Sequence, residues 1–400
     1  MIDIKNVLVP VFLFLLTTFL VVQVSLHIVE TTKKTEELME ETVDSYKEID
    51  ISSIEAIEDE KILTREKKDR LVFVGDIFFS TNIRRSYNDG GVDAIISESF
   101  RKVLESSDLN IANLECSITD DDDKPYDKTY VFALPTKYAS ALKEIGIGLF
   151  TLANNHILDF GVDALSKTME ILDNLGIAHV GAGTTLQEAK KAYIKEIEGK
   201  KYAIIGASAV LPDVSWIASE SRGGVYNGYD IEKVAEDIKD IKSLCDKVIV
   251  YIHWGKELEG ESNKTQKAFA HKLVDAGADL VIGTHPHITE EVEYYNGVPI
   301  VYSLGNFIYG GQSRDMYMCE AIFDYSDAPD GSLRLKLHPG ISGYKSTREY
   351  DTDRETQNKI IILNKKSREC YIDKDGYVYS LDEKKNIDLE KASSSDMIDN

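Results

Sequence analysis

Five short apolar runs, each followed by a polar residue able to bind a metal ion, constrain this chain more than any other feature. Runs of this length bounded by turn residues are typical of buried β-strands. In an open α/β sheet the carboxyl ends of the strands line one crevice, where ligands bind. Polar groups buried there without a partner would destabilise the fold, unless they converge on a cation. The runs and the residues that follow them are 71–74 with Asp76, 109–112 with Glu115, 145–152 with Asn155 and His156, 248–252 with His253, and 280–282 with His285 and His287.

The last of these runs is the most informative, because two histidines stand two residues apart just beyond it. Gly283 ends the apolar run and Pro286 stiffens the loop, so His285 and His287 can both turn inward if the loop bends. Neutral imidazole is the commonest side-chain ligand of transition metals. Two polar loop residues without a ligand are the alternative, and the four other runs of the same design favour metal binding.

The residue types fit a centre of up to two divalent ions. Two ions about 3.5–4 Å apart are bridged by a carboxylate and surrounded by Asp, Asn and His. A bound ion lowers the pKa of a water molecule, which becomes a nucleophile at neutral pH. His156 is then placed to protonate a leaving oxygen, and mixed oxygen and nitrogen ligands favour Mn, Fe or Zn over Ca. The predicted metal ligands are Asp76, Glu115, Asn155, His253, His285 and His287.

Composition excludes several classes of protein. The 400 residues carry a formal net charge of −23 at pH 7. We therefore expect no nucleic-acid binding, which needs clustered Lys and Arg. The four cysteines are far apart and include no Cys-x-x-Cys pair, so neither a zinc ribbon nor a disulfide scaffold is indicated.

The N-terminal segment predicts attachment to a membrane. Residues 7–29 contain no charged side chain and are long enough to cross a bilayer as a helix; a buried helix of a soluble domain is the alternative. We find no small-residue cleavage site, so residues 1–29 are expected to be an uncleaved anchor rather than a signal peptide. Lys5 precedes the span and Lys33 and Lys34 follow it, so charge does not give its orientation.

The remaining chain divides into three predicted parts. Residues 30–70 are rich in charged and hydroxyl side chains and are expected to form a stalk. Residues 71–343 are predicted to be one α/β domain, with helical patterns at 92–106, 162–175, 231–244 and 266–276 and a Gly-rich loop at 210–229 that borders a cleft. From residue 318 alternating patterns predict antiparallel strands. Residues 344–400 are expected to be a small, mostly β extension, with a hairpin turning at Asp375-Gly376 and a polar tail.

Six motifs in one order give a family resemblance. They are Gly75-Asp76, Asn113-Leu-Glu115, Ala153-Asn-Asn-His156, His253-Trp-Gly255, Gly283-Thr-His-Pro-His287 and Tyr302-Ser-Leu-Gly-Asn-Phe307. With them, residues 71–343 resemble the CapA (PgsA) family of poly-γ-glutamate capsule biosynthesis proteins. That family is similar in fold to the calcineurin-like metallophosphoesterases. The resemblance implies a layered α/β sandwich with an N-terminal transmembrane helix, and a domain held outside the cell at the cell membrane.

The resemblance also implies roles for single residues. Asp76 resembles the first metal-binding Asp of the phosphoesterases, Glu115 their bridging carboxylate, and Asn155 with His156 their Asn ligand and catalytic His. His253, His285 and His287 resemble the later histidine ligands. Four further residues are expected to support these ligands or to contact substrate, with core packing as the alternative for the tryptophan: Asn113, Asn154, Trp254 and Asn306.

Two positions depart from the phosphoesterase pattern. Those enzymes have a histidine two residues after the first Asp, where this chain has Phe78, and an Asp where it has Glu115. One of the two metal sites is therefore expected to be weaker or vacant.

Three functions remain open from the sequence. The first is a membrane-anchored extracellular component of poly-γ-glutamate synthesis or export, which handles the polymer near the metal centre. The second is an active metal-dependent hydrolase of a phosphoester or a γ-glutamyl amide. The third is a non-catalytic scaffold for the membrane-embedded synthase subunits. Because the polymer is a polyanion and this chain is acidic, its binding needs local positive charge, from metal ions or from Arg84, Arg85 or Arg222.

Overall fold

The computed structural model describes residues 68–121, 128–326 and 329–387, which belong to one compact unit. The predicted anchor, nearly all of the predicted stalk and the end of the polar tail lie outside the described residues. Strand β1 begins at Lys68, so the last three residues of the predicted stalk belong to the fold. Within the described residues, none of the helices is both long and apolar enough to cross a membrane.

The larger of two main sheets has ten strands. Its parallel part is formed by β1, β2, β5 and β6, with β15 also parallel to β1, and its other strands are antiparallel. The strands are β1 Lys68–Ile77, β2 Leu109–Leu114, β5 Leu149–Thr151, β6 Ala178–Val180, β15 Asn306–Ile308, β16 Arg314–Asp324, β17 Ser332–Ser342, β18 Thr347–Glu349, β19 Cys370–Ile372 and β20 Tyr377–Ser380.

The second main sheet has six strands, in the order β13-β14-β12-β11-β9-β8. Strands β9, β11, β12 and β14 are parallel, and the edge strands β8 and β13 are antiparallel to their neighbours. They are β8 Tyr193–Ile197, β9 Lys200–Ser208, β11 Lys247–His253, β12 Leu280–Thr284, β13 Val292–Tyr295 and β14 Val298–Val301. Two short pairs complete the strands: β3 Ser117–Ile118 with β4 Ala133–Leu134, and β7 Ala182–Gly183 with β10 Gly224–Val225.

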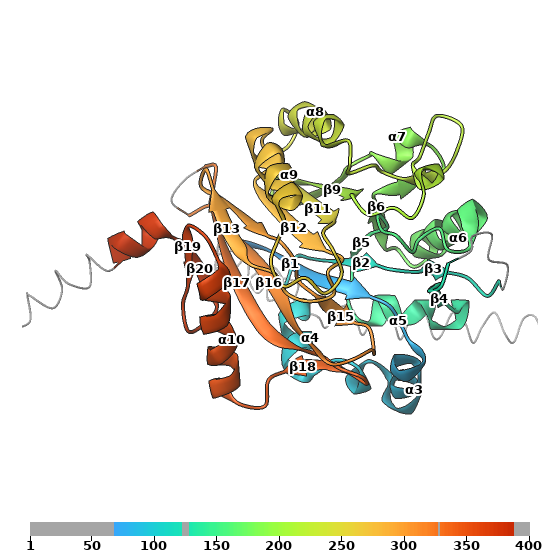
Figure 1. Ribbon diagram of the computed structural model, residues 1–400, viewed down its shortest axis with the longest axis horizontal. Helices are drawn as coiled ribbons and strands as arrows, with labels where there is room; N and C mark the ends of the chain where they lie inside the picture. The colour runs from blue at the N-terminus through green and yellow to red at the C-terminus, as the bar shows by residue number, and fades with distance from the viewer. Residues whose placement is uncertain (1–67, 122–127, 327–328, 388–400) are drawn as a thin grey trace, which may run out of the picture. The chain divides into compact units, whose positions relative to one another are not determined.

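Helices lie on the outer faces of the two sheets, except α10, which packs against the core that the two sheets share (Figure 1). The α-helices are α3 Thr81–Gly90, α4 Glu98–Glu105, α5 Ala139–Glu144, α6 Gly161–Asn174, α7 Leu186–Ala189, α8 Ile231–Lys242, α9 Lys264–Asp275 and α10 Asp353–Lys366. Short 3-10 helices are η1 Gly91–Ala94, η2 Thr136–Tyr138 and η3 Val214–Trp216.

Three hydrophobic cores define the layers. Alternate residues of β1 point to opposite faces of the larger sheet: Leu71 and Phe73 enter a core shared with the six-stranded sheet, whereas Val72 and Val74 enter a core with α3, α4, α5 and α6. The six-stranded sheet buries its other face against α8 and α9. The order of layers is therefore helices, sheet, sheet, helices. Burial of both faces explains why the parallel strands read as continuous apolar runs.

The sequence predicts most of these elements, with two differences in the helices. The predicted helix at 92–106 is two pieces, η1 and α4, because Ile96 and Ser97 pair instead with Thr347 at the end of the larger sheet. The extension at 344–400 contains the predicted hairpin, β19 and β20. It is not mostly β, because the 14-residue helix α10 is its longest element. A capping box at Thr352 and Glu355 starts that helix and is the sequence signal that would have found it.

Candidate metal centre

The carboxyl ends of the parallel strands bring the predicted ligands together, as expected. Asp76, near the end of β1, is in register with Asn113 of β2 and with Asn306 of β15. His253 ends β11 beside Thr284, the last residue of β12. The two sheets meet here, because the Tyr251 hydroxyl of β11 donates a hydrogen bond of 2.5 Å to the backbone oxygen of Val74 in β1. We call the place where these strand ends meet, with Asp76, Asn113, His253 and Thr284, the carboxyl edge.

The loop after β12 bends as the Gly283 and Pro286 signals predict. His285 and His287 have φ angles of 99° and 60°, in the left-handed region that non-glycine residues rarely adopt. Their rings lie 5.9 Å apart, centroid to centroid, and both face the carboxyl edge. Backbone strain of this kind is found mostly at functional sites.

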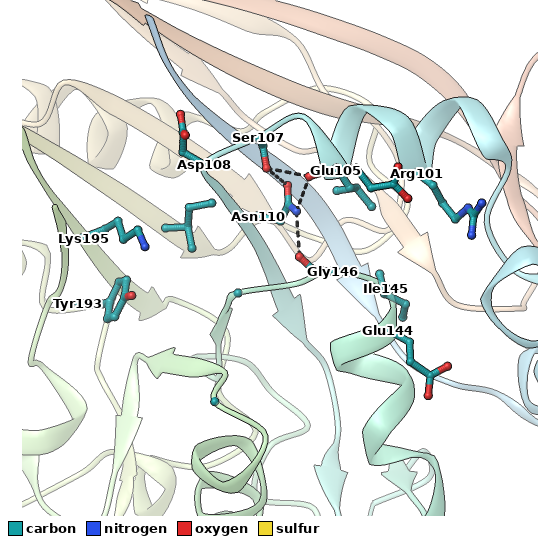
Figure 2. A pocket seen from close by; sticks show the side chains of 14 residues that line it. Arg101, Glu105, Ser107, Asp108, Asn110, Glu144, Ile145, Gly146, Tyr193 and Lys195 are labelled. Carbon is teal, nitrogen blue, oxygen red and sulfur yellow. Dashed lines mark hydrogen bonds between the residues drawn. The ribbon is translucent and has the colours of Figure 1, made fainter. Parts of the chain in front are cut away.

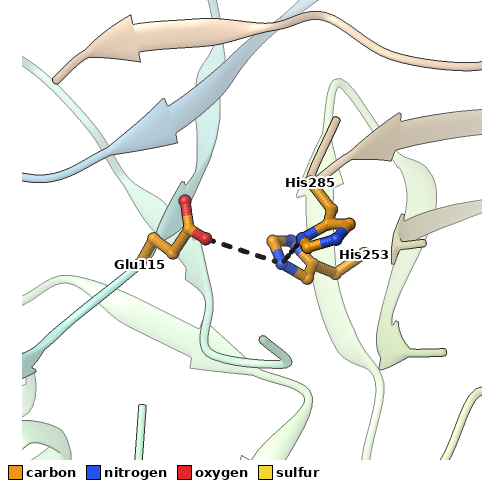
Figure 3. A group of neighbouring side chains, drawn as sticks. All are labelled: Glu115, His253 and His285. Carbon is orange, nitrogen blue, oxygen red and sulfur yellow. Dashed lines mark hydrogen bonds and ion pairs between the residues drawn. The ribbon is translucent and has the colours of Figure 1, made fainter. Parts of the chain in front are cut away.

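Glu115, Asn155, His253 and His285 form the first candidate group, which we call the four-donor group. Figure 3 shows Glu115, His253 and His285 of this group. His253 Nε2 lies 2.9 Å from Asn155 Oδ1, 3.1 Å from His285 Nδ1 and 3.7 Å from Glu115 Oε1. Ligands about 2.0–2.2 Å from a tetrahedral metal ion are themselves about 3.3–3.6 Å apart. The donor atoms therefore have nearly the separation that a metal ion requires.

Glu115 is the strongest evidence for a cation. Its side chain is fully buried, and neither carboxylate oxygen has a hydrogen-bond partner among the described residues. Burial raises the pKa of Glu115 well above its usual range; the neighbouring His287 opposes this shift and Asp76 adds to it. A buried carboxylate without hydrogen bonds is strongly destabilising. A divalent ion would supply the missing partner.

The histidines of the four-donor group have the protonation state that metal binding requires. Burial lowers the pKa of His253 well below its usual range, and neighbouring His285 and His287 lower it further. Burial, followed by His287, lowers the pKa of His285 to about 3. Both rings are therefore neutral at pH 7, which is the form that binds metal.

Asp76, Glu115 and His287 form a second candidate group, the three-donor group. Asp76 accepts hydrogen bonds from Asn113 Nδ2 at 2.8 Å and from the His285 backbone N–H at 3.4 Å. His287 Nδ1 lies 3.4 Å from Asp76 Oδ2 and 3.8 Å from Glu115 Oε2. Although burial opposes the charged imidazolium, Glu115 and Asp76 raise the pKa of His287 to about 10.

His156, the predicted catalytic acid, lies at the same edge and is held by residues that the sequence did not single out. Its Nδ1 is 2.7 Å from Asp159 Oδ2. Lys128 pairs with the other Asp159 oxygen and donates a hydrogen bond of 2.6 Å to the Asn155 backbone oxygen. Burial lowers the pKa of His156, and the Asp159 carboxylate opposes that shift. Asp159, three residues after His156, was detectable in the sequence, whereas nothing in the sequence marks Lys128.

The remaining predicted residues lie behind the donor groups. Asn154 donates to Asn113 Oδ1 at 3.0 Å and to the Leu114 backbone oxygen at 2.7 Å, and thereby fixes the 153–156 turn against β2. Asn306 Oδ1 is 2.8 Å from His287 Nδ1. Trp254 is buried, and its Nε1 donates to the Tyr302 backbone oxygen at 2.9 Å. It therefore packs in the core beneath the centre.

Lys128 brings positive charge to the centre, whereas the predicted Arg85 is an exposed residue of α3. Arg84 bonds to Thr81 within α3, and Arg222 bonds to the Ile217 backbone oxygen at an exposed position. Lys128 Nζ lies over the Trp216 ring, 4.8 Å from its centroid. Because Trp216 belongs to η3, the predicted loop at 210–229 does reach this edge.

A cavity of about 440 Å³ lies at the other end of the same strands (Figure 2). Asn110, the second residue of β2, reaches it with a fully bonded side chain. Its Nδ2 donates to the backbone oxygens of Leu104 and Gly146, both at 2.9 Å, and its Oδ1 accepts from Ser107 Oγ at 2.6 Å. This cavity, which we call the amino-edge cavity, is separate from the candidate metal centre.

Comparisons with known proteins agree with these motifs. The model of the family described as bacterial capsule synthesis protein PGA_cap matches residues 70–310. The chain is 30% identical over 272 residues to the PGA biosynthesis protein CapA of Bacillus subtilis, covering 67% of this chain and 70% of that protein. It is 34% identical over 219 residues to a probable polyglutamine synthesis accessory protein of Mycobacterium tuberculosis, covering 52% and 57%.

A solved phosphatase structure from Mycoplasma pneumoniae is similar over 70% of this chain and 95% of that one, with a TM-score of 0.46 and 14% identity. The family match spans more than half of the chain and includes every residue of the two donor groups. The chain therefore belongs to the bacterial capsule synthesis protein family.

Proposed function

We propose that this protein is a membrane-anchored, extracellular component of poly-γ-glutamate synthesis or export, and that it binds the polymer at a divalent metal centre. Family membership and the names of the relatives support the pathway. The resemblance to calcineurin-like metallophosphoesterases supports the centre. The anchor is assigned to residues 7–29, and membrane-embedded synthase subunits are the expected protein partners.

The observation that carries the metal centre is the buried Glu115 carboxylate, which has no hydrogen bond and lies 3.7 Å from Nε2 of the neutral His253 ring. The donors are two nitrogens and two oxygens, a set suited to Mn, Fe or Zn. A bound ion would supply a Lewis acid that attracts the carboxylate groups of an anionic polymer. It would also offset the strongly negative charge of the chain at the point of contact.

The protein's own residues prepare that contact. Asp159 orients His156 through Nδ1, so that His156 Nε2 can donate or accept a proton at a bound group. Phe132 stacks on the His156 ring with centroids 4.0 Å apart and shields it from water. Lys128 keeps a positive charge beside Asp159 and Asn155.

A gene-deletion strain tests this role. We expect the strain to lose surface poly-γ-glutamate, and the parent gene to restore it. A Glu115→Gln variant should not restore it, because the ion would be lost. A Glu105→Gln variant, with the same change at an exposed position, should restore it fully. Normal capsule in the deletion strain would disprove the role, and full rescue by Glu115→Gln would disprove the part played by the centre.

The His156–Asp159 pair favours a second candidate function, a metal-dependent hydrolase of a phosphoester or a γ-glutamyl amide. Purified full-length protein loaded with Mn or Zn should then cleave an aryl phosphate or γ-glutamyl polymer, and His156→Ala should abolish cleavage. If neither substrate is cleaved, a binding or scaffolding role with the synthase remains.

A further inference from the structure

Tyr309 lies at the candidate metal centre, although it belongs to none of the six motifs. It follows β15, the strand in which Asn306 is in register with Asp76 of β1. The ring of Tyr309 lies 4.9 Å from the ring of His287, centroid to centroid, at an interplanar angle of 53°. The strand pairing that aligns Asn306 with Asp76 therefore also brings Tyr309 beside the three-donor group.

Neighbouring aromatic rings hold the Tyr309 side chain in place. Phe78 meets its ring edge-on at 5.6 Å, and Phe132 meets it edge-on at 6.0 Å with an interplanar angle of 88°. Aromatic pairs in this geometry are stabilising beyond the area that they bury. Phe132 also stacks on His156 at 4.0 Å. The rings thus form a continuous set from His287 to His156, and the Tyr309 hydroxyl is attached to a fixed ring.

The Tyr309 hydroxyl has no hydrogen-bond partner in the part of the chain that the structure describes. Other tyrosines of the two sheets differ in this respect. The hydroxyls of Tyr202, Tyr251 and Tyr302 are buried and donate to protein oxygens at 2.5–2.6 Å. The side chain of Tyr309 is instead partly exposed, so a group that enters the centre from solution can take the place of water at its hydroxyl.

The carboxylates of the donor groups act on this hydroxyl. Burial raises the pKa of Tyr309 well above its usual range, and Glu115 and then Asp76 raise it further. Because the interaction of two charges weakens with distance, the hydroxyl lies near both carboxylates. A phenol is neutral at pH 7 and donates its proton in a hydrogen bond. The Tyr309 hydroxyl can therefore bond to an oxygen that a metal ion holds at the centre.

Other side-chain donors at the centre are already engaged with the protein. Asn113 Nδ2 donates to Asp76 at 2.8 Å, Asn154 Nδ2 donates to Asn113 and to a backbone oxygen, and Lys128 pairs with Asp159. A ligand that recruited one of these donors would have to break a bond within the protein. The Tyr309 hydroxyl is available without that loss.

We propose that Tyr309 contacts the substrate, and that its hydroxyl donates a hydrogen bond to an anionic oxygen, of a carboxylate or of a phosphoryl group, held at the metal centre. This inference rests on the metal centre of the proposed function and adds a substrate-binding residue to it. The Phe78 and Phe132 rings beside Tyr309 are partly exposed and suit the methylene groups of a γ-glutamyl chain.

Binding of a γ-glutamyl oligomer to the full-length protein, loaded with Mn and titrated by calorimetry, tests the proposal. Tyr309→Phe removes the hydroxyl and keeps the ring. We expect this variant to bind the oligomer at least about tenfold more weakly than the parent, because a hydrogen bond to a charged group is lost. Its Mn content and melting temperature should equal those of the parent. Tyr344→Phe makes the same change at an exposed position and should bind as the parent does.

A second titration, with inorganic phosphate, identifies the source of the anionic oxygen. Weaker phosphate binding by Tyr309→Phe, in a protein whose parent does not bind the oligomer, would support the Tyr309 contact and disprove polymer binding. Equal affinity of the parent and Tyr309→Phe for every anion that the parent binds would overturn the contact and leave the proposed function intact. Loss of Mn from Tyr309→Phe would also overturn it, because the hydroxyl would then support a metal ligand. A parent that binds neither anion would overturn both.

Discussion

Glu115 and Asn110 lie at opposite ends of one strand and show two different uses of a buried polar residue. Asn110 is the second residue of β2 and Glu115 follows its last, so they are separated by about 17 Å of extended chain. Both are buried. Every polar atom of the Asn110 side chain is hydrogen-bonded, whereas neither Glu115 oxygen is.

Whether a buried polar group is hydrogen-bonded indicates a ligand site better than the presence of a cavity does. The amino-edge cavity is lined by several charged side chains, yet the protein itself supplies the hydrogen-bond partners of its buried amide (Figure 2). The carboxyl edge contains the desolvated Glu115 carboxylate, which has no hydrogen bond among the described residues (Figure 3). Buried polar groups in native proteins are nearly always bonded, so the exception marks the site of a ligand.

The largest effect should come from removing the ion at the carboxyl edge. Binding at 1,000 times the dissociation constant stabilises a protein by about 4 kcal/mol, so chelation should lower the melting temperature by about 10 °C. Glu115→Gln should abolish this response, and in the metal-free state it should be no less stable than the parent, because a buried unpaired carboxylate is gone. Calorimetry with and without chelator measures both.

Glu105→Gln is the control for that experiment, because it makes the same substitution at an exposed residue of the amino-edge cavity. It should retain the full response to chelator. An equal response in the parent and in Glu115→Gln would mean that Glu115 binds no ion, and the contrast between the two ends of β2 would fail.

A second buried carboxyl near the carboxyl edge should respond to pH. Glu290 accepts from Gln266 Nε2 at 2.8 Å, but its Oε1 has no hydrogen-bond partner among the described residues. Burial raises its pKa to about 8. The folded state therefore holds a proton that the unfolded state loses near pH 4.5. Relative to Glu290→Gln, the parent should lose about 3 kcal/mol of unfolding free energy between pH 4.5 and 8.

Urea unfolding of both proteins at pH 5 and pH 8 measures this difference. Glu261→Gln, at an exposed position, is the control and should follow the parent at each pH. If the unfolding free energies of the parent and Glu290→Gln change with pH in parallel, Glu290 is ionised and paired. Glu290 would then not be a second buried carboxyl that lacks a partner, as Glu115 is.

The sequence predicts the carboxyl edge well because each buried strand is an apolar run that ends in a polar residue. Each apolar run is buried on both faces, so its end is visible as an abrupt change to Asp76, Glu115, His253 or His285. Parallel pairing then brings these ends together. The loop bend at His285 and His287 follows from Gly283 and Pro286 in the same way.

Features set by tertiary contacts were less predictable. Lys128 reaches the centre from a loop, and its partners Asp159 and Asn155 are distant in sequence. The break between η1 and α4 depends on pairing with Thr347, about 250 residues later. The Asn110 side chain donates its hydrogen bonds to backbone oxygens of two separate segments. The apolar pattern of the sequence therefore cannot show that Asn110 is fully hydrogen-bonded and Glu115 is not.

Removing the hydrogen bonds of Asn110 tests the amino end of β2, where the buried polar side chain is fully hydrogen-bonded. Asn110→Ala removes the side-chain donor to the Gly146 oxygen and one of the donors to the Leu104 oxygen, so we expect a loss of about 2 kcal/mol in unfolding free energy. Metal content should not change. Ser106→Ala removes one exposed hydrogen bond on the same helix end and should alter stability by less than about 0.5 kcal/mol. A loss of metal in Asn110→Ala would show that the two ends of β2 are coupled.

The smallest expected effect concerns the pair that holds His156. The Asp159 carboxylate raises the pKa of His156 against the effect of burial, and Lys128, 3.4 Å from Nδ1, lowers it. Asp159→Asn should therefore lower the pKa of His156, and Lys128→Met should raise it. Titration of the His156 ring proton by NMR in metal-free protein gives both values. The opposite signs are the test, because loosening of the 153–156 turn would admit water and raise the pKa in both variants. Opposite shifts would show that the charges of Asp159 and Lys128, as well as burial, set the pKa of His156. Shifts of the same sign would show that Asp159 has only a structural role.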